Sequence, residues 1–253
     1  MLLDDERLKS ILADVAKKLK VDKKWRYVIK KLDEEIVNYS GNLRLISLID
    51  KTNDKVYKLI CKTPPNWAIA SIVDAIVINE YHAYSTLFPI FKSLKSSVDV
   101  DNLFPECYYI DSKPDNRVLV FQDMTSKGFE RRHGNNFDFN HMTVTLETIA
   151  KYHALSFILR ENDISNVYAN RLKSFSEKRP ECLFEFIKHF VDEWLPVFKD
   201  KYYVHVLEGI SKNIERNMEE CVAKAKGLVY GHGDLWKENI LFKYSVSIVY
   251  YHT

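Results

Sequence analysis

Three side chains between Val229 and Phe242 have the types and the spacing needed for acid–base and metal chemistry. His232, Asp234 and Asn239 follow the order His-x-Asp-x-x-x-x-Asn, which is the spacing of a phosphoryl-transfer loop. In such a loop the aspartate accepts the proton of the attacking hydroxyl, and the asparagine binds a magnesium ion held by the nucleotide phosphates. We expect His232 to pack under the loop and to hold its backbone by hydrogen bonds.

Apolar residues flank this polar loop on both sides, at 228–230 and 240–242. That pattern predicts a strand, a tight loop and a second strand, with both strands buried. The alternative is a buried hairpin that carries its polar residues by chance. The extension of the His-Gly-Asp core by Trp236 and Asn239 favours the functional interpretation.

The composition is that of an ordinary globular protein and narrows the range of partners. The 253 residues are 46% hydrophobic and 28% charged, which suits one large domain or two lobes. A formal net charge of +2 is too small to indicate binding to nucleic acid or to a membrane surface. An acidic N-terminus, four scattered cysteines and no apolar run of about 18 residues favour a reducing, cytoplasmic location.

The N-terminal half of the chain alternates between helical and strand-like patterns. Apolar residues at helical spacing predict an amphipathic helix over residues 4–20. Apolar runs at 25–32, 43–49 and 56–62 predict three strands of a small antiparallel sheet. Residues 68–97 have the pattern of a helix. The sequence therefore places a sheet and at least two helices before the middle of the chain.

The second half of the chain is mainly helical in pattern, after two further strands at 104–110 and 117–129. Helices are expected over 139–159, 183–197 and 201–225, with Gly227 ending the last of them. In the first of these helices, apolar residues at spacings of three and four are expected to form one face, and His153 on it to be a packed structural histidine. That face consists of Met142, Leu146, Ile149, His153 and Phe157.

The stretch from Gly231 to Asn239, Gly-His-Gly-Asp-Leu-Trp-x-x-Asn, resembles the ecdysteroid-kinase-like family, whose relatives are choline kinases and aminoglycoside phosphotransferases. The resemblance implies a protein-kinase-like α+β fold. Residues 1–125 would form a nucleotide-binding lobe with a small antiparallel sheet, and residues 126–253 a mainly helical lobe. It further implies ATP and Mg²⁺ as cofactors, and as acceptor a hydroxyl of a small molecule, for which the family name points to steroid alcohols.

Two further matches to the family concern a lysine and a glutamate. Lys62 closes the third expected strand, in the run Lys58-Leu-Ile-Cys-Lys-Thr-Pro-Pro65, which resembles the family pattern Ile-Val-Lys-Val-Pro-Pro. The resemblance implies that Lys62 binds the nucleotide α- and β-phosphates, whereas a lysine at a strand end is otherwise an ordinary surface residue. Glu80 would then pair with Lys62, although a glutamate on a helix more commonly faces solvent.

The remaining matches concern backbone contacts to the nucleotide. Gly41 would belong to a phosphate-binding loop, although a lone glycine at such a position is more often an ordinary hairpin glycine. The run Arg117 to Phe129 resembles the hinge between the lobes, where the Gln122 carbonyl and the Met124 amide would bind adenine. A sheet-edge strand that runs into a loop is the alternative there.

The resemblance extends from about residue 38 to Tyr244 and then stops. Family members continue into a strand ending in Ile-Asp-Phe-Gln, whose aspartate binds the nucleotide magnesium, but no Asp or Glu follows Glu238 here. Asn239 alone is a poor magnesium site because Mg²⁺ prefers carboxylate ligands. We therefore expect a C-terminally truncated family member with little or no kinase activity. The alternatives are a non-catalytic nucleotide-binding remnant and a helical interaction protein, and the oligomeric state is open.

Overall fold

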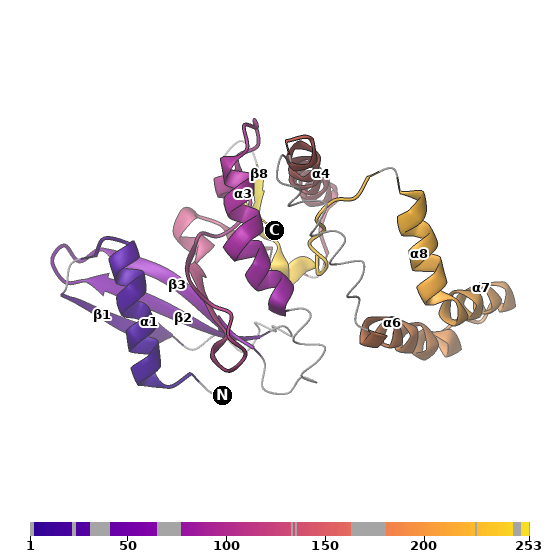
Figure 1. Cartoon of the computed structure of the whole chain (residues 1–253), viewed down its shortest axis with the longest axis horizontal. Coiled ribbons are helices and arrows are strands. Elements are labelled where there is room, and N and C mark those ends of the chain that lie inside the picture. The colour runs from indigo at the N-terminus through magenta and orange to yellow at the C-terminus, as the bar shows by residue number, and fades with distance from the viewer. Residues whose placement is uncertain are drawn as a thin grey trace.

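The computed structural model places a five-stranded antiparallel sheet beside a group of helices (Figure 1). This mixed architecture agrees with the expected kinase-like two-lobed fold. The structure describes residues 3–21, 24–30, 41–64, 77–132, 134, 136–162, 181–225, 227–244 and, as backbone, 249–252. None of the helices in these ranges is long and apolar enough to cross a membrane.

The five-stranded sheet has the order β1-β2-β3-β5-β4, and every neighbouring pair is antiparallel. The three strands expected near the N-terminus form one edge of it, and the two later strands complete it. Their bounds are β1 Trp25–Lys30, β2 Asn42–Asp50, β3 Val56–Thr63, β4 Cys107–Asp111 and β5 Val118–Gln122. All five strands were thus predicted, except that β4 begins at Cys107 and not at residue 104, and β5 ends at Gln122 and not at residue 129.

Helix α1 (Asp5–Lys18) covers one face of this sheet, as the apolar periodicity predicted (Figure 1). Asp4 begins the helix, because its side chain accepts a hydrogen bond of 2.8 Å from the Arg7 amide. The apolar side chains of the helix are buried together with those of β2, β3 and β5. The helix residues in this core are Leu8, Ile11, Leu12, Val15 and Ala16.

A helical segment follows β3 and continues the first half of the chain. It is described from Val77, passes through a π-helical turn at Ala83–Leu87 (η1) and ends as α3 (Phe88–Ser93). The expected helix 68–97 is therefore confirmed in its described part, ends four residues early, and begins outside the described residues. A single π-turn inserts one extra residue into a helix and is frequent next to functional sites.

The segment after β5 forms a short connection between the sheet and the helices. It consists of the 3₁₀ turn η4 (Met124–Lys127) and the two-residue strand β6 (Glu130–Arg131). Gly128 lies between them in the left-handed region, with φ +83°, where a residue without Cβ is unstrained. The chain then enters α4 (Phe139–Glu161), which the sequence predicted closely.

The face of α4 that is buried is not the one expected. Met142 and Leu146 are 43% and 59% exposed, and Phe157 is also exposed. The buried side instead carries polar residues with apolar ones between them: His141, Thr145, Thr148, Tyr152, Leu155, Ser156 and Leu159. Some of these polar side chains have hydrogen-bond partners within the helix or on a neighbouring segment. The Thr145 hydroxyl, for example, donates to the His141 carbonyl oxygen at 2.8 Å.

Three helices, α6 (Glu181–Trp194), α7 (Lys201–Lys212) and α8 (Ile214–Lys224), pack on one another at one end of the molecule (Figure 1). The single helix expected over 201–225 is in fact two, because the helix breaks at Asn213. The Asn213 amide side chain donates to the Gly209 carbonyl oxygen at 2.9 Å and caps α7. The prediction of a single helix over residues 201–225 was therefore wrong.

A second, three-stranded sheet has the order β6-β7-β8, with β7 at Leu241–Tyr244 and β8 at Val249–His252. Neither this sheet nor β6 was expected. The strand predicted at 228–230 is not confirmed, because the structure assigns no secondary structure to these residues. Only the second arm of the predicted strand-loop-strand unit is thus confirmed, as β7.

Candidate functional site

The polar loop begins at Tyr230, which α4 holds in place. The Tyr230 amide donates to the Ser156 hydroxyl oxygen at 3.0 Å, and both side chains are buried. At the other end, Ile240 and Phe242 are 3% and 0% exposed. The loop is therefore anchored on both sides by buried residues, while the residues between them reach the surface.

Asp234 and Asn239 are bonded to each other across the loop. The Asn239 side-chain nitrogen donates to the Asp234 backbone oxygen at 2.8 Å and to its carboxylate Oδ2 at 2.9 Å. Because the amide nitrogen is held by this carboxylate, the amide oxygen Oδ1 is the atom left for a cation. The 3₁₀ turn η6 (Lys237–Asn239) brings the two residues together by folding the chain back.

His232 holds the loop backbone, as expected, but it does so from the surface. Its Nδ1 accepts a hydrogen bond of 3.3 Å from the Asp234 amide. The expectation that it packs under the loop stays a prediction: the residue is exposed at the surface, although the surrounding protein desolvates its ring. Gly233, between the two residues, has φ +82° and permits this tight turn.

The His232 imidazole links the loop electrostatically to the sheet. Partial desolvation by the surrounding protein is the main cause that lowers its pKa, opposed by the carboxylates of Asp234 and Glu80, while the Lys62 ammonium adds to the lowering. A neutral ring suits the observed geometry, because Nδ1 can accept a hydrogen bond only when it is not protonated. The charges of Lys62, Glu80 and Asp234 therefore all influence the pKa of His232.

Lys62 and Glu80 form the ion pair that the family resemblance implied. The Lys62 ammonium lies 2.7 Å and 2.8 Å from the two Glu80 carboxylate oxygens, and the side chains are only 12% and 26% exposed. Lys62 stands on β3 opposite Leu43 of β2. Glu80 comes from the helical segment that precedes η1. Contact with both oxygens fixes the direction of the ammonium.

Gly41 lies directly against the Lys62 side chain. A Cβ built on Gly41 would stand 2.7 Å from the Thr63 backbone oxygen and 3.0 Å from Lys62 Cε. No side chain fits there without displacing the lysine or the strand. This close approach explains the glycine without any need for an unusual φ, which Gly41 does not have. The rest of the expected phosphate loop, 38–40, lies outside the described residues.

The expected hinge residues lie where β5 runs into η4. The Gln122 amide donates to the Glu106 carbonyl oxygen at 2.8 Å, and the Asp123 amide to that of Lys58 at 3.0 Å. The Met124 side chain is buried. The contacts expected from the Gln122 carbonyl and the Met124 amide to adenine stay predictions. One feature was missed: the Gln122 side-chain Oε1 is buried without a partner among the described residues.

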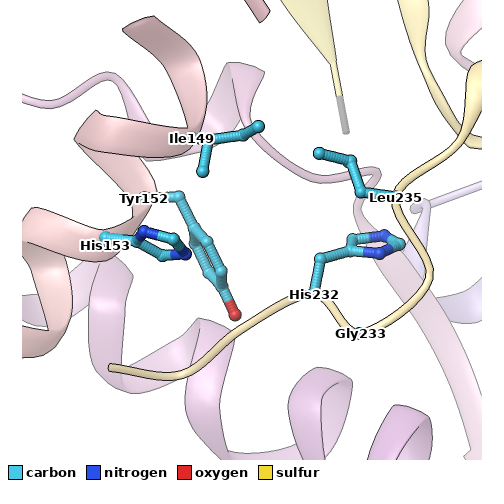
Figure 2. A pocket seen from close by; sticks show the side chains of 6 residues that line it. All are labelled: Ile149, Tyr152, His153, His232, Gly233 and Leu235. Carbon is cyan, nitrogen blue, oxygen red and sulfur yellow. The ribbon is translucent and has the colours of Figure 1, made fainter. Parts of the chain in front are cut away.

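A pocket of about 210 Å³ opens between α4 and the polar loop (Figure 2). Figure 2 shows Tyr152 and His153 on the α4 side, facing His232 and Leu235 on the loop. His153 was expected to be a packed structural histidine. It is half-buried and lines this pocket instead. Periodicity alone did not reveal this, because the opposite wall comes from residues about 80 positions later.

The described residues fit ATP with magnesium better than they fit a metal held by the protein alone. Among them, no group of three or more His, Cys, Asp and Glu side chains could hold a metal ion. The loop offers the Asn239 amide oxygen, next to the Asp234 carboxylate. Mg²⁺ is usually bound by one or two carboxylates together with substrate phosphates, so an ion at Asn239 would take most of its ligands from the nucleotide.

Comparison with known proteins identifies the family. No curated protein and no solved structure matches the chain. The model of the ecdysteroid kinase-like family, in contrast, matches residues 37–249. This range covers most of the chain and includes every candidate site residue. The family implies a kinase-like phosphotransferase, in agreement with the geometry above. The chain therefore belongs to the ecdysteroid kinase-like family.

Proposed function

We propose that this protein transfers the γ-phosphoryl group of ATP to a hydroxyl of a small molecule. The observation that carries the proposal is the combination of two pre-arranged pairs, Lys62–Glu80 and Asp234–Asn239. His232 responds to the charges of Lys62, Glu80 and Asp234 together, which supports a shared cleft. Phosphoryl transfer depends mainly on positioning and electrostatic stabilisation, and these pairs supply both.

On the sheet side, Lys62 would bind the α- and β-phosphates. Its ammonium is held by both oxygens of Glu80, so little rotamer entropy remains to be lost on binding. Gly41 would let the chain approach the phosphates closely, because a larger residue would push the lysine aside. The segment of Gln122 and Met124 would bind adenine through backbone groups.

On the loop side, Asp234 would accept a hydrogen bond from the acceptor hydroxyl and orient it for in-line attack. The proton would pass to the Asp234 carboxylate as the bond from the acceptor oxygen to the γ-phosphorus forms and the bond from that phosphorus to the bridging β-phosphate oxygen breaks, so that ADP leaves. Asn239 holds Oδ2 of this carboxylate and would direct its own Oδ1 toward magnesium. When bound with ATP, magnesium would neutralise charge on the β- and γ-phosphates.

The acceptor that we propose is a neutral, largely apolar alcohol. The pocket beside the loop is lined by Ile149, Leu235 and aromatic rings, and none of the described residues that line it carries a carboxylate that could attract a cationic acceptor. Its volume of about 210 Å³ holds one part of such a molecule and not a whole steroid nucleus. A steroid alcohol would therefore place one ring there and leave the rest outside.

The test is a comparison of phosphoryl transfer and of nucleotide-induced thermal stabilisation in matched variants. Lys62→Ala should abolish stabilisation by Mg-ATP, whereas Lys58→Ala, an exposed lysine of the same strand, should keep it. Asp234→Asn should keep nucleotide binding and lower transfer to a panel of neutral alcohols about 10²- to 10⁴-fold, the usual effect of losing a general base. Exposed Asp115→Asn serves as its control.

Three results would contradict the proposal. The first is an absence of Mg-ATP stabilisation in the wild-type chain. The second is equal stabilisation of the Lys62→Ala variant. Stabilisation that depends on Lys62 but occurs without any transfer would support a non-catalytic nucleotide-binding protein instead.

A further inference from the structure

An ion pair outside the proposed site joins its loop to the segment that follows the hinge. The Arg131 guanidinium nitrogen Nη1 lies 3.4 Å from Oε2 of Glu238, and the two side chains are 33% and 21% exposed. The other carboxylate oxygen, Oε1, lies 3.5 Å from the Lys237 ammonium. Each oxygen of Glu238 thus has its own cation, one local and one from a strand about 100 residues earlier.

The backbone around this ion pair is also joined. Arg131 is paired with Leu241, and Glu130 with Phe242, in the ladder between β6 and β7. Beyond the ladder, the Lys243 ammonium stands 5.7 Å from the centre of the Phe129 ring. The ladder joins β6 to β7, the ion pair joins β6 to η6, and the ring contact joins β7 to the residue before β6; a two-residue strand such as β6 needs such support.

The carboxylate of Asp234 is hydrogen-bonded to Asn239, the residue next to Glu238. Asn239 follows Glu238 directly, and its side chain holds both the backbone oxygen and the carboxylate of Asp234. We propose that Arg131 is a positioning residue, which through Glu238 fixes η6 and thereby the orientation of Asn239 and Asp234. This role rests on the proposed function of those two residues.

Of the contacts between the β6 segment and the loop, the Arg131–Glu238 ion pair is the one whose removal should affect folding least. Arg131 and Glu238 are partly exposed, so their attraction is modest and screened by salt. Its removal should loosen the turn without unfolding the protein. The predicted defect is therefore one of orientation, greatest where Asn239 must present Oδ1 to a magnesium ion bound with the nucleotide.

The first measurement is hydrogen exchange of the Asn239 and Ile240 amides in the full chain. These amides donate to Trp236 and Lys237 within the turn, at 2.9 Å and 3.4 Å. In Arg131→Gln they should exchange about fivefold faster than in the wild type, the size expected for an exposed ion pair. Arg132→Gln is the matched control, because Arg132 is paired with Asp138 and not with the loop.

The second measurement is the dependence of phosphoryl transfer on Mg²⁺ concentration. Arg131→Gln should require about fivefold more Mg²⁺ for half-maximal rate, with an unchanged KM for ATP at saturating Mg²⁺. Glu238→Gln should have the same effect, and the double variant should be no worse than either single one. Raising the salt concentration should reduce the difference from the wild type.

The outcomes separate this inference from the proposed function. Unchanged amide exchange in Arg131→Gln, or effects of Arg131→Gln and Arg132→Gln that are equal, would overturn the role of Arg131. So would additive effects in the double variant or a Mg²⁺ requirement that does not move. If the wild type shows no transfer while Arg131→Gln still loosens the turn, the proposed function is wrong although the ion pair holds the loop.

Discussion

The contact between Gly41 and Lys62 gives a sharp prediction, because one added methyl group should disturb the proposed phosphate-binding lysine. In Gly41→Ala the new Cβ would stand 2.7 Å from the Thr63 backbone oxygen, 3.0 Å from Lys62 Cε and 3.2 Å from Lys62 Cγ. The contact with the Thr63 oxygen can be relieved only by a shift of backbone, and the contacts with the lysine stem by a shift or rotation of that side chain. We therefore expect the lysine to move and its contact with Glu80 to weaken.

The magnitude follows from two opposing terms. Gly41 does not have positive φ, so alanine is allowed by the backbone and would stabilise the fold by about 0.4–1 kcal/mol through the unfolded chain. Overpacking costs about 1–3 kcal/mol, which leaves a net loss of roughly 0–2.5 kcal/mol. A weakened charge-assisted contact is worth about 1.5–3 kcal/mol, or roughly 10- to 100-fold in affinity for Mg-ATP.

Urea unfolding measures the change in stability. Titration with Mg-ATP, monitored by calorimetry or thermal shift, measures the change in affinity. Gly209→Ala is the matched control, because a Cβ there meets no atom within 4 Å and the residue is inside α7. That control should stabilise the protein by about 0.5–1 kcal/mol, the usual gain of alanine over glycine in a helix. If Gly41→Ala binds Mg-ATP as tightly as Gly209→Ala, the steric argument is refuted.

Three further predictions test the surroundings of the site. Ser156→Ala removes the buried acceptor of the Tyr230 amide and should cost about 1–3 kcal/mol in urea unfolding, whereas unchanged stability would exclude that anchor. Burial raises the pKa of the Cys61 thiol to about 11, so in the native protein a thiol reagent should label exposed Cys221 before Cys61, as mass spectrometry would show. Folding lowers the pKa of His232, so below about pH 6.5 the unfolded chain binds more protons than the folded protein does. The wild type should therefore lose more stability than His232→Asn between pH 7 and pH 5; an equal loss would contradict this.

Local sequence patterns correctly predicted the elements that have apolar residues on one face and polar residues on the other. Helix α1 is the clearest case, since its apolar residues at spacings of three and four are the ones that became buried. The strands β2 and β3 were found for a similar reason. The Lys62–Glu80 pair was reached by a different route, through resemblance to a family, and neither residue would have been chosen from periodicity.

Burial of polar residues explains the main error in the helical half. On α4 the protein buries Thr145, Thr148 and Ser156, and leaves Met142 and Leu146 exposed. Serine and threonine can be buried in a helix because their hydroxyls bond to carbonyl oxygens one turn earlier or to a neighbouring segment. Ser156 does the latter through Tyr230. A reading by hydrophobicity alone assigns such a face to solvent.

Other parts of the site depend on contacts that no local pattern contains. The pocket joins α4 to the loop, and the Arg131–Glu238 pair joins β6 to η6. Strand β6 has only two residues, Glu130 and Arg131, both charged, so nothing in its sequence indicates a strand. The break at Asn213 was missed because apolar spacing continues on both sides of it. These features require the tertiary structure.

The two halves of the proposed site differ in how far they are prepared for reaction. The Lys62 side chain is only 12% exposed and is held by both oxygens of Glu80, so the nucleotide side is arranged before any ligand binds. Asp234 is exposed, and water competes for its carboxylate. An acceptor that covers Asp234 would remove this water and strengthen its interactions with the developing charge. Binding energy from the apolar part of the acceptor should therefore raise kcat and not only lower KM, because it contributes to the arrangement that the loop lacks.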